Sequence, residues 1–254
     1  MLLIFIKTLA IDPLTVRAER FGDSMIVFEP FIAVGNSGAL TLFIPLVFLV
    51  LFSDYPKLGG NSLFYISRTG KTAWLCGQML FLIMSVLTFL GAIFAASMLF
   101  SGGHFNTEWS ETVRKYAARF PEEAHNFDSQ LLPSNLYNQI PMMTALWQTS
   151  TLLAMYLLSF ALIIYLLKML FSSSVGLAGS LVVMALGVAL TSLYSPIKWA
   201  FPTANAIIWL HYEEILSKPI YPVWASFAYF GVLLAVLTAG NFLALKRLKF
   251  TEER

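Results

Sequence analysis

Five long apolar stretches without a single Asp, Glu, Lys, Arg or His constrain the fold more than any other feature of this sequence. They cover residues 31–52, 73–100, 142–167, 175–193 and 223–245. A helix needs about 20 apolar residues to cross a bilayer core. Charged residues make up only 12% of the chain, about half the share of a soluble domain. The sequence therefore predicts an all-α fold, a polytopic membrane helix bundle that forms one domain over residues 1–254.

Basic residues gather at one set of span ends. The loop 53–72, the link 168–174 and the tail 246–254 together hold eight Lys and Arg against three Asp and Glu. Because basic residues near span ends stay in the cytoplasm, we expect a multi-pass protein of the cell membrane with a cytoplasmic C-terminus. With five spans, residues 1–30 are then either an external or re-entrant segment, or they follow a first span that is missing here.

Two segments on the opposite side stand out. Residues 101–141 form a long polar loop whose ETVRKYAARF portion is typical of an amphipathic helix. Residues 194–222 contain three aromatic, apolar turns bounded by prolines, which are too short to cross the membrane and too apolar for an ordinary loop. They predict a re-entrant helical hairpin before the last span, formed by Tyr194, Pro196, Trp199, Phe201, Pro202 and Trp209.

The spans lack the acids, bases and histidines that coupling ions require inside a membrane. This absence argues against a proton-driven carrier, and polar span residues such as Asn36 and Thr149 are expected to hydrogen-bond between helices. His211 with Glu213 and Glu214 lacks a second ligand cluster in any span, so we expect a surface turn of the hairpin instead of a metalloprotease site. The four-residue spacing of Ser172, Gly176 and Ser180 predicts a helix-packing face.

The stretch FYISRTGKTAWL, residues 64–75, ends its basic turn in Gly-Lys-Thr, the last letters of a phosphate-binding loop. Such a loop needs a first glycine five positions before Gly70, after a strand. That position is Tyr65, and no strand pattern precedes it, so the chain is not expected to bind nucleotide. Two interpretations stay open: an elbow at the membrane interface, or a coupling element gripped by a cytoplasmic motor.

The segment SDYPKLGGNSLFYISRTGKTAWLCGQML and the aromatic hairpin resemble type-2 ABC exporter permeases, the bacterial class that includes bacteriocin-immunity and drug-efflux subunits. The resemblance covers residues 31–254. It implies six spans, a second membrane subunit, and a separate cytoplasmic ATP-binding-cassette ATPase that carries ATP and Mg. It also implies an ATPase-coupling loop made of Phe64, Tyr65, Arg68, Gly70, Lys71 and Trp74. The family's first span is not recognisable here, and the loop 101–141 is longer than in the family.

These features together predict the membrane (permease) subunit of an ATP-driven exporter, with no catalytic site and no cofactor of its own. Its substrate is expected to be amphipathic: a peptide, a lipid or a drug. The expected partners are the ATPase, a second membrane subunit and the lipid bilayer; the small net charge of +2 argues against nucleic acid. The alternative is a non-transporting membrane scaffold or receptor that binds an external ligand through the loop 101–141.

Overall fold

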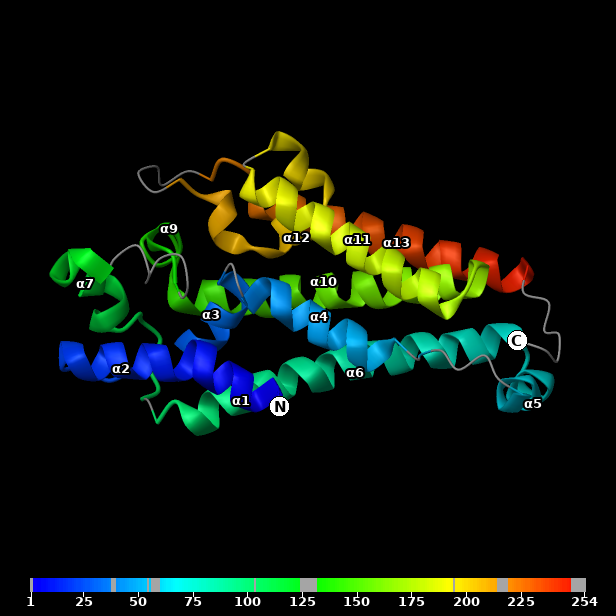
Figure 1. Ribbon diagram of the computed structural model, residues 1–254, viewed down its shortest axis with the longest axis horizontal. Helices are drawn as coiled ribbons and strands as arrows, with labels where there is room; N and C mark the ends of the chain where they lie inside the picture. Colours follow the sequence, from blue (N-terminus) through cyan, green and yellow to red (C-terminus); the bar gives the residue numbers. More distant parts are fainter. Residues whose placement is uncertain are drawn as a thin grey trace.

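The computed structural model describes residues 2–37, 40–53, 55, 60–102, 104–123, 132–193, 195–213 and 219–247. Across these ranges the chain is helical, and the only strand-like pairing is an isolated bridge between Ile26 and His104. Figure 1 shows an elongated bundle whose long helices run along its length. The predicted all-α membrane bundle is confirmed at this level. We name the two ends of the bundle after the short helices α7 (Glu111–Arg119) and α5 (Gly60–Thr69) that lie there.

Four helices are long and apolar enough to cross a membrane within the described residues: α6 (Lys71–Phe100), α10 (Met142–Leu170), α11 (Ser173–Ser192) and α13 (Val223–Arg247). Each coincides with one of the four predicted spans after residue 72. The most buried of them is α10, which packs against α6, α11 and α13. The core of the bundle therefore forms around α10.

The predicted span 31–52 is not one straight helix. It consists of α3 (Glu29–Asn36) and α4 (Leu40–Phe52), which are bent by 83° relative to each other. Ser37 leaves the helical conformation with φ −68° and ψ 132°, so α3 ends there. The pair is either a broken span or a re-entrant loop. The span predicted at 31–52 stays a prediction, and its uncharged apolar run does not reveal the break in its middle.

Residues 2–21 form one continuous rod next to the bundle. It comprises α1 (Leu2–Ile6), a π-helical turn η1 (Lys7–Ile11) and α2 (Asp12–Phe21). Gly22 ends it in the left-handed conformation, φ 84°, which glycine adopts at low cost. The ring of Phe5 packs 5.1 Å from that of Phe43 in α4, and α2 lies beside α7 (Figure 1). The rod thus starts against the bundle and runs toward the α7 end.

The predicted hairpin consists of three short helical turns: η2 (Pro196–Ala200), α12 (Pro202–Ala206) and η3 (Ile208–His211). Because α11 ends and α13 begins at the same end of the bundle (Figure 1), the chain between them does not cross it. The turn α12 packs against α10, α11 and α13. The hairpin is therefore part of the packed bundle.

Small residues let α11 approach α10 closely. A Cβ on Gly176 would lie 3.0 Å from the carbonyl oxygen of Ile164, and one on Gly179 would collide with Leu167. The same helix places Gly187 directly against Thr203 of the hairpin. The predicted packing face is confirmed at Gly176 and Ser180, which are buried, whereas Ser172 is exposed and caps the start of α11.

Candidate functional site

The helix α5 is a short amphipathic element at its end of the bundle, where it packs chiefly against α6 (Figure 1). Ile66 faces inward and is 8% exposed, whereas Phe64 and Tyr65 are 59% and 61% exposed. The guanidinium carbon of Arg68 lies 5.2 Å from the centre of the Phe64 ring. Three of the six residues predicted for the coupling loop therefore share one exposed aromatic and basic surface, Phe64, Tyr65 and Arg68.

Gly70 separates α5 from α6 and accounts for the glycine of the Gly-Lys-Thr triplet. Its φ of 83° and ψ of 155° fall in a region that only glycine tolerates. Its N–H donates to the carbonyl of Ile66, and its carbonyl accepts from the N–H of Trp74. A helix, α5, precedes this glycine where a phosphate-binding loop requires a strand. The triplet is a turn between two helices.

The other two predicted residues differ in their surroundings. Lys71 is exposed at the first position of α6. Trp74 lies one turn further and is buried, with its ring 6.5 Å from that of Tyr165 in α10. The predicted set is thus brought together along the chain, but Trp74 holds α6 to the core while the rest lies at the surface.

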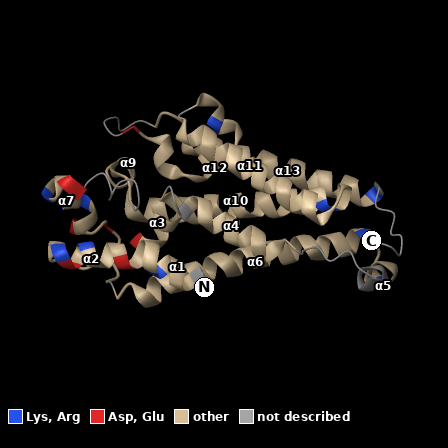
Figure 2. Ribbon diagram, in the orientation of Figure 1, with Lys and Arg blue, Asp and Glu red and all other residues tan. Residues whose placement is uncertain are grey.

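Charge distinguishes the two ends (Figure 2). Around α5 and the neighbouring helix ends, the side chains that the structure describes include basic ones and no acidic ones: Arg68, Lys71, Lys168 and Lys246. The α7 end mixes both signs, with ion pairs such as Lys115 with Glu111. The α5 end is therefore compact and basic, the charge pattern on which the predicted orientation rests.

A buried polar cluster joins the broken helix pair to the hairpin. Asn36, the last residue of α3, donates to Thr149 Oγ1 in α10 at 2.9 Å and accepts from the backbone N–H of Ile208 at 3.1 Å. Its backbone carbonyl accepts from Trp209 Nε1 at 2.8 Å. The interhelical role expected for Asn36 and Thr149 is confirmed, and the hairpin is an additional partner that the sequence did not reveal.

A second set of bonds holds the hairpin to α13. Asn205 donates to the carbonyls of Trp199 and Phe201, and its Oδ1 accepts from Ser226 Oγ at 2.7 Å. Ser226 also lies 3.3 Å from His211 Nε2. The side chains of Asn205, His211 and Ser226 are fully buried. We call Asn36, Thr149, Asn205, His211 and Ser226 the hairpin network.

His211 corrects the expectation of a surface turn, because it is 0% exposed. Its Nδ1 lies 2.8 Å from the carbonyl oxygen of Tyr221, and its ring packs against Trp199. Burial lowers the pKa of His211 to about 4, so the ring is neutral at pH 7. The backbone brings the chain back at Pro219–Tyr221, and that return covers the histidine; no local sequence signal indicates it.

The predicted hairpin residues act as packing elements. The Trp199 ring stacks on Tyr221 at 4.1 Å and 16°. Pro196 and Pro202 each occupy the first turn of a helical segment, and Phe201 precedes α12. Trp209 makes the bond to Asn36 described above. Tyr194 lies outside the described residues.

The loop 101–141 folds against both the N-terminal segment and the hairpin. Glu29 is 1% exposed and accepts from the N–H groups of Ile26 and Ser110 at 3.1 and 2.8 Å. The short helix α9 (Ser134–Tyr137) reaches the hairpin, since Asn135 Nδ2 donates to the carbonyls of Trp209 and Tyr212. The described parts of the loop are therefore folded and packed against the rest of the chain. The amphipathic helix predicted in ETVRKYAARF is present as α7.

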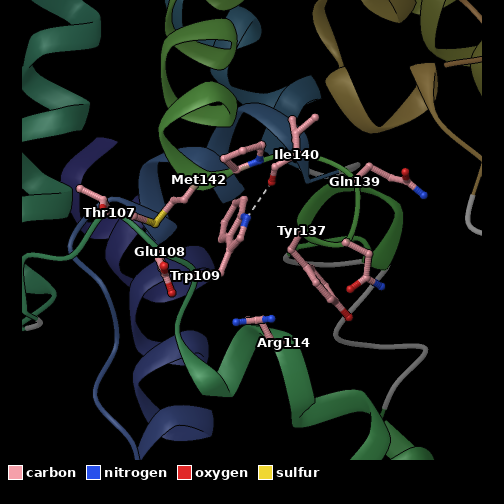
Figure 3. Close-up of a pocket in the computed structure, with 10 residues that line it drawn as sticks. Thr107, Glu108, Trp109, Arg114, Tyr137, Gln139, Ile140 and Met142 are labelled. Atoms are coloured by element: carbon pink, nitrogen blue, oxygen red, sulfur yellow. Dashed lines mark hydrogen bonds between the residues drawn. The ribbon is translucent and has the colours of Figure 1, made fainter. Parts of the chain in front are cut away.

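A pocket of about 360 Å³ opens between α7, α9 and the start of α10 (Figure 3). Trp109 occupies its centre and donates from Nε1 to the carbonyl of Ile140 at 2.9 Å. Arg114 and Tyr137 lie beside the indole, and Glu108 and Gln139 complete the polar wall. We call this the outer pocket. A cation, a carboxylate and two aromatic rings suit a ligand with mixed polar and apolar character.

Two groups at these sites were absent from the sequence prediction, the buried carboxylate of Glu29 and the indole of Trp109. The described residues contain no group of three His, Cys, Asp or Glu side chains able to hold a metal ion. Comparison with protein-family models, with curated proteins and with solved structures finds no match to this chain.

Proposed function

We propose that this chain is the membrane subunit of an ATP-driven exporter and that a separate ATPase docks on α5. The observation that carries the proposal is the exposed surface of α5, where Phe64 and Tyr65 flank Arg68 at the basic end of the bundle. Aromatic residues and arginine are the side chains enriched at protein interfaces. Because α5 joins α6 through a single glycine, movement imposed on α5 is passed directly to a long helix of the bundle.

The broken pair α3–α4 and the hairpin support the same proposal. Transporters place irregular backbone where it is covered by protein and lines a substrate path. Here the end of α3 and the hairpin meet at Asn36. The surrounding bundle offers aliphatic and aromatic surface without charge, which favours an amphipathic substrate such as a peptide, a lipid or a drug. A second membrane subunit completes the transporter in this proposal.

Purification from native membranes tests the proposal. An exporter subunit recovers a nucleotide-binding ATPase, whereas the isolated chain binds no ATP, with or without Lys71→Ala. The double change Arg68→Glu and Lys71→Glu reverses two charges at the docking surface and is expected to weaken ATPase recovery at least tenfold, because like charges at an interface cost several kcal/mol. The matched control, Arg114→Glu with Lys115→Glu at the α7 end, should leave recovery unchanged. Equal recovery with both double variants contradicts the proposal.

The outer pocket favours a second candidate function, a membrane scaffold or receptor that binds an external ligand through the loop 101–141. The observation behind it is the exposed Arg114 and Glu108 around a fixed indole (Figure 3). In that case Arg114→Ala abolishes ligand capture by the purified chain and no ATPase accompanies it. The exporter proposal predicts a co-purified ATPase that Arg114→Ala does not affect.

A further inference from the structure

A second pocket, apart from the hairpin network and the outer pocket, lies along the N-terminal rod. It measures about 380 Å³ and is lined by one stripe of the rod together with two residues from the loop 101–141. The lining residues are Thr8, Asp12, Pro13, Val16, Arg17, Arg20, Tyr116 and Glu123. We call it the rod pocket.

Most charges around the rod pocket are already paired. Asp12 forms an ion pair with Lys7 at 3.3 Å. Glu123 pairs with Arg20 and accepts a hydrogen bond from Tyr116 OH at 2.7 Å. The bonds from Tyr116 and Arg20 lower the pKa of Glu123, so the carboxylate stays ionised in this pairing at neutral pH.

Arg17 is engaged less directly than these charges: its guanidinium carbon lies 5.9 Å from the centre of the Tyr116 ring, and it attracts the Glu123 carboxylate from a distance. It forms no ion pair with a carboxylate of the described residues. Its Nη1 donates to the carbonyl of Pro13 at 3.1 Å, and its Nε is buried with no hydrogen-bond partner. A buried donor without an acceptor is costly, and a guanidinium offers parallel donors that match a phosphate. Arg17, in the wall of the rod pocket, therefore has donor capacity that the described part of the chain does not use.

The rod also indicates what carries that anion. On the α1 side of the pocket the rod exposes Leu3, Ile4 and Leu9, with Ile4 70% exposed. Within the pocket, Val16 is 61% exposed. Leu9 lies about 12 Å from Arg17 along the helix axis, at 1.5 Å per residue. Phe5 on the same turns packs against Phe43 of the apolar helix α4. Exposed apolar side chains beside a membrane helix, followed along the rod by an arginine that has no ion pair within the described residues, fit an amphiphile with an anionic head.

We propose that the rod pocket binds the phosphate of a membrane phospholipid, with Arg17 as its principal ligand and the acyl chains along Leu3, Ile4 and Leu9. Basic pockets next to membrane helices bind lipid head groups in this manner. The site does not depend on transport, so it stands or falls separately from the exporter proposal.

Native mass spectrometry of the purified full chain in detergent tests the site with three probes. Phosphatidylglycerol has both chains and phosphate, diacylglycerol with the same chains lacks the phosphate, and glycerol 3-phosphate lacks the chains. We expect phosphatidylglycerol to bind at least tenfold more tightly than either of the others. Diacylglycerol binding as tightly as phosphatidylglycerol overturns the role of the phosphate, and glycerol 3-phosphate binding equally well overturns the lipid assignment.

Substitutions then locate the site. Arg17→Gln should weaken phosphatidylglycerol binding about tenfold, the factor that corresponds to losing one charge-assisted hydrogen-bonded pair. Arg17→Lys keeps the charge but loses the fork and should fall between the two. Lys115→Gln removes a charge from the same end outside the pocket and should bind as the wild type does. An unchanged melting temperature for Arg17→Gln establishes that it is folded; wild-type affinity in that variant overturns the proposal.

Discussion

The two ends of this bundle are built in opposite ways. At the α7 end, segments far apart in the sequence are tied by specific bonds: Glu29 to Ser110, Asn135 to Trp209, and Asn36 to Ile208. At the α5 end, a ten-residue helix packs chiefly against the helix that follows it. The α7 end pairs most of its polar groups within the chain, whereas the α5 end exposes two aromatic rings next to each other.

This difference separates structural from interaction surfaces. Most buried polar groups at the α7 end are paired, because an unpaired one costs about 1–3 kcal/mol, and such pairing fixes one arrangement of the chain. Arg17 Nε is an exception. Phe64 and Tyr65 have no such role in the fold, since they are more than half exposed. Exposed aromatic residues beside an arginine are typical of a surface that a membrane or a partner covers.

The largest expected effect is all-or-none and concerns which end faces the cytoplasm. In a Cys76→Ser background, we expect a cysteine at Thr107 to react with a membrane-impermeant thiol reagent in intact cells. A cysteine at Thr69 should react only after permeabilisation. Both threonines are exposed in the structure, so access depends on the side of the membrane alone. The reverse labelling pattern would invert the orientation and remove α5 from the cytoplasm.

A large loss of stability is expected from Asn36→Leu. The change removes the Asn36 partner of the buried Ile208 N–H and of the Thr149 hydroxyl. For two such groups we expect the free energy of unfolding to fall by about 2–5 kcal/mol. Asn241→Leu is the matched change in the other half of the bundle. There the amide donates to the carbonyls of Leu162 and Leu237, which lie within helices, so we expect a cost under about 1 kcal/mol. Thermal unfolding in detergent measures both; equal losses would contradict the contrast between the two ends.

The fold was predictable from the sequence wherever composition alone decides it. Uncharged runs reveal α6, α10, α11 and α13, and closely spaced prolines reveal the hairpin. The break between α3 and α4 was not predictable, because it depends on partners of Asn36 that are more than a hundred residues away. Tertiary hydrogen bonds of this length leave no local pattern.

The candidate sites divide along the same line. Phe64, Tyr65 and Arg68 were predicted from their own neighbourhood, and α5 presents them together. The burial of His211 was missed, since a polar segment rich in Glu and Tyr is typical of a surface turn, and its cover comes from the returning chain at Tyr221. Arg17 was missed because only the fold shows that neighbouring carboxylates are already paired.

Acid should loosen the hairpin more than the α5 end. The pKa of His211 is about 4 in the folded chain and about 6.5 when unfolded. As the pH falls, His211 therefore takes up a proton in the unfolded chain before it does so in the folded chain. The contribution of His211 to the free energy of unfolding is complete above pH 6.5 and falls as the pH drops toward 4. The loss is at most about 3 kcal/mol, from 1.36 kcal/mol per pKa unit. Melting temperatures across this pH range, with exchange of hairpin amides, measure it.

His211→Asn is the control for this pH dependence, because it keeps a donor toward the Tyr221 carbonyl without a group that titrates. We expect the variant to be less stable at pH 7, yet to lose less stability between pH 6.5 and 4 than the wild type. An identical acid profile in both chains would assign the loss to other groups.

The smallest expected effect is the one that most sharpens the comparison, because it asks whether α5 is held by its own fold or prepared for a partner. Phe64→Ser and Tyr65→Ser change side chains that are already exposed. We therefore expect the free energy of unfolding of the purified chain to stay within about 0.5 kcal/mol of the wild type. Ile66→Ser, which changes the side chain that faces inward, should cost more, about 1–3 kcal/mol. If the exposed pair serves a docked ATPase, the two silent changes reduce recovery of the complex while leaving the isolated chain intact. If they serve only as an elbow on the lipid surface, recovery is unchanged. A variant that is stable alone but fails to assemble with the ATPase shows that these exposed side chains serve partner binding and not folding.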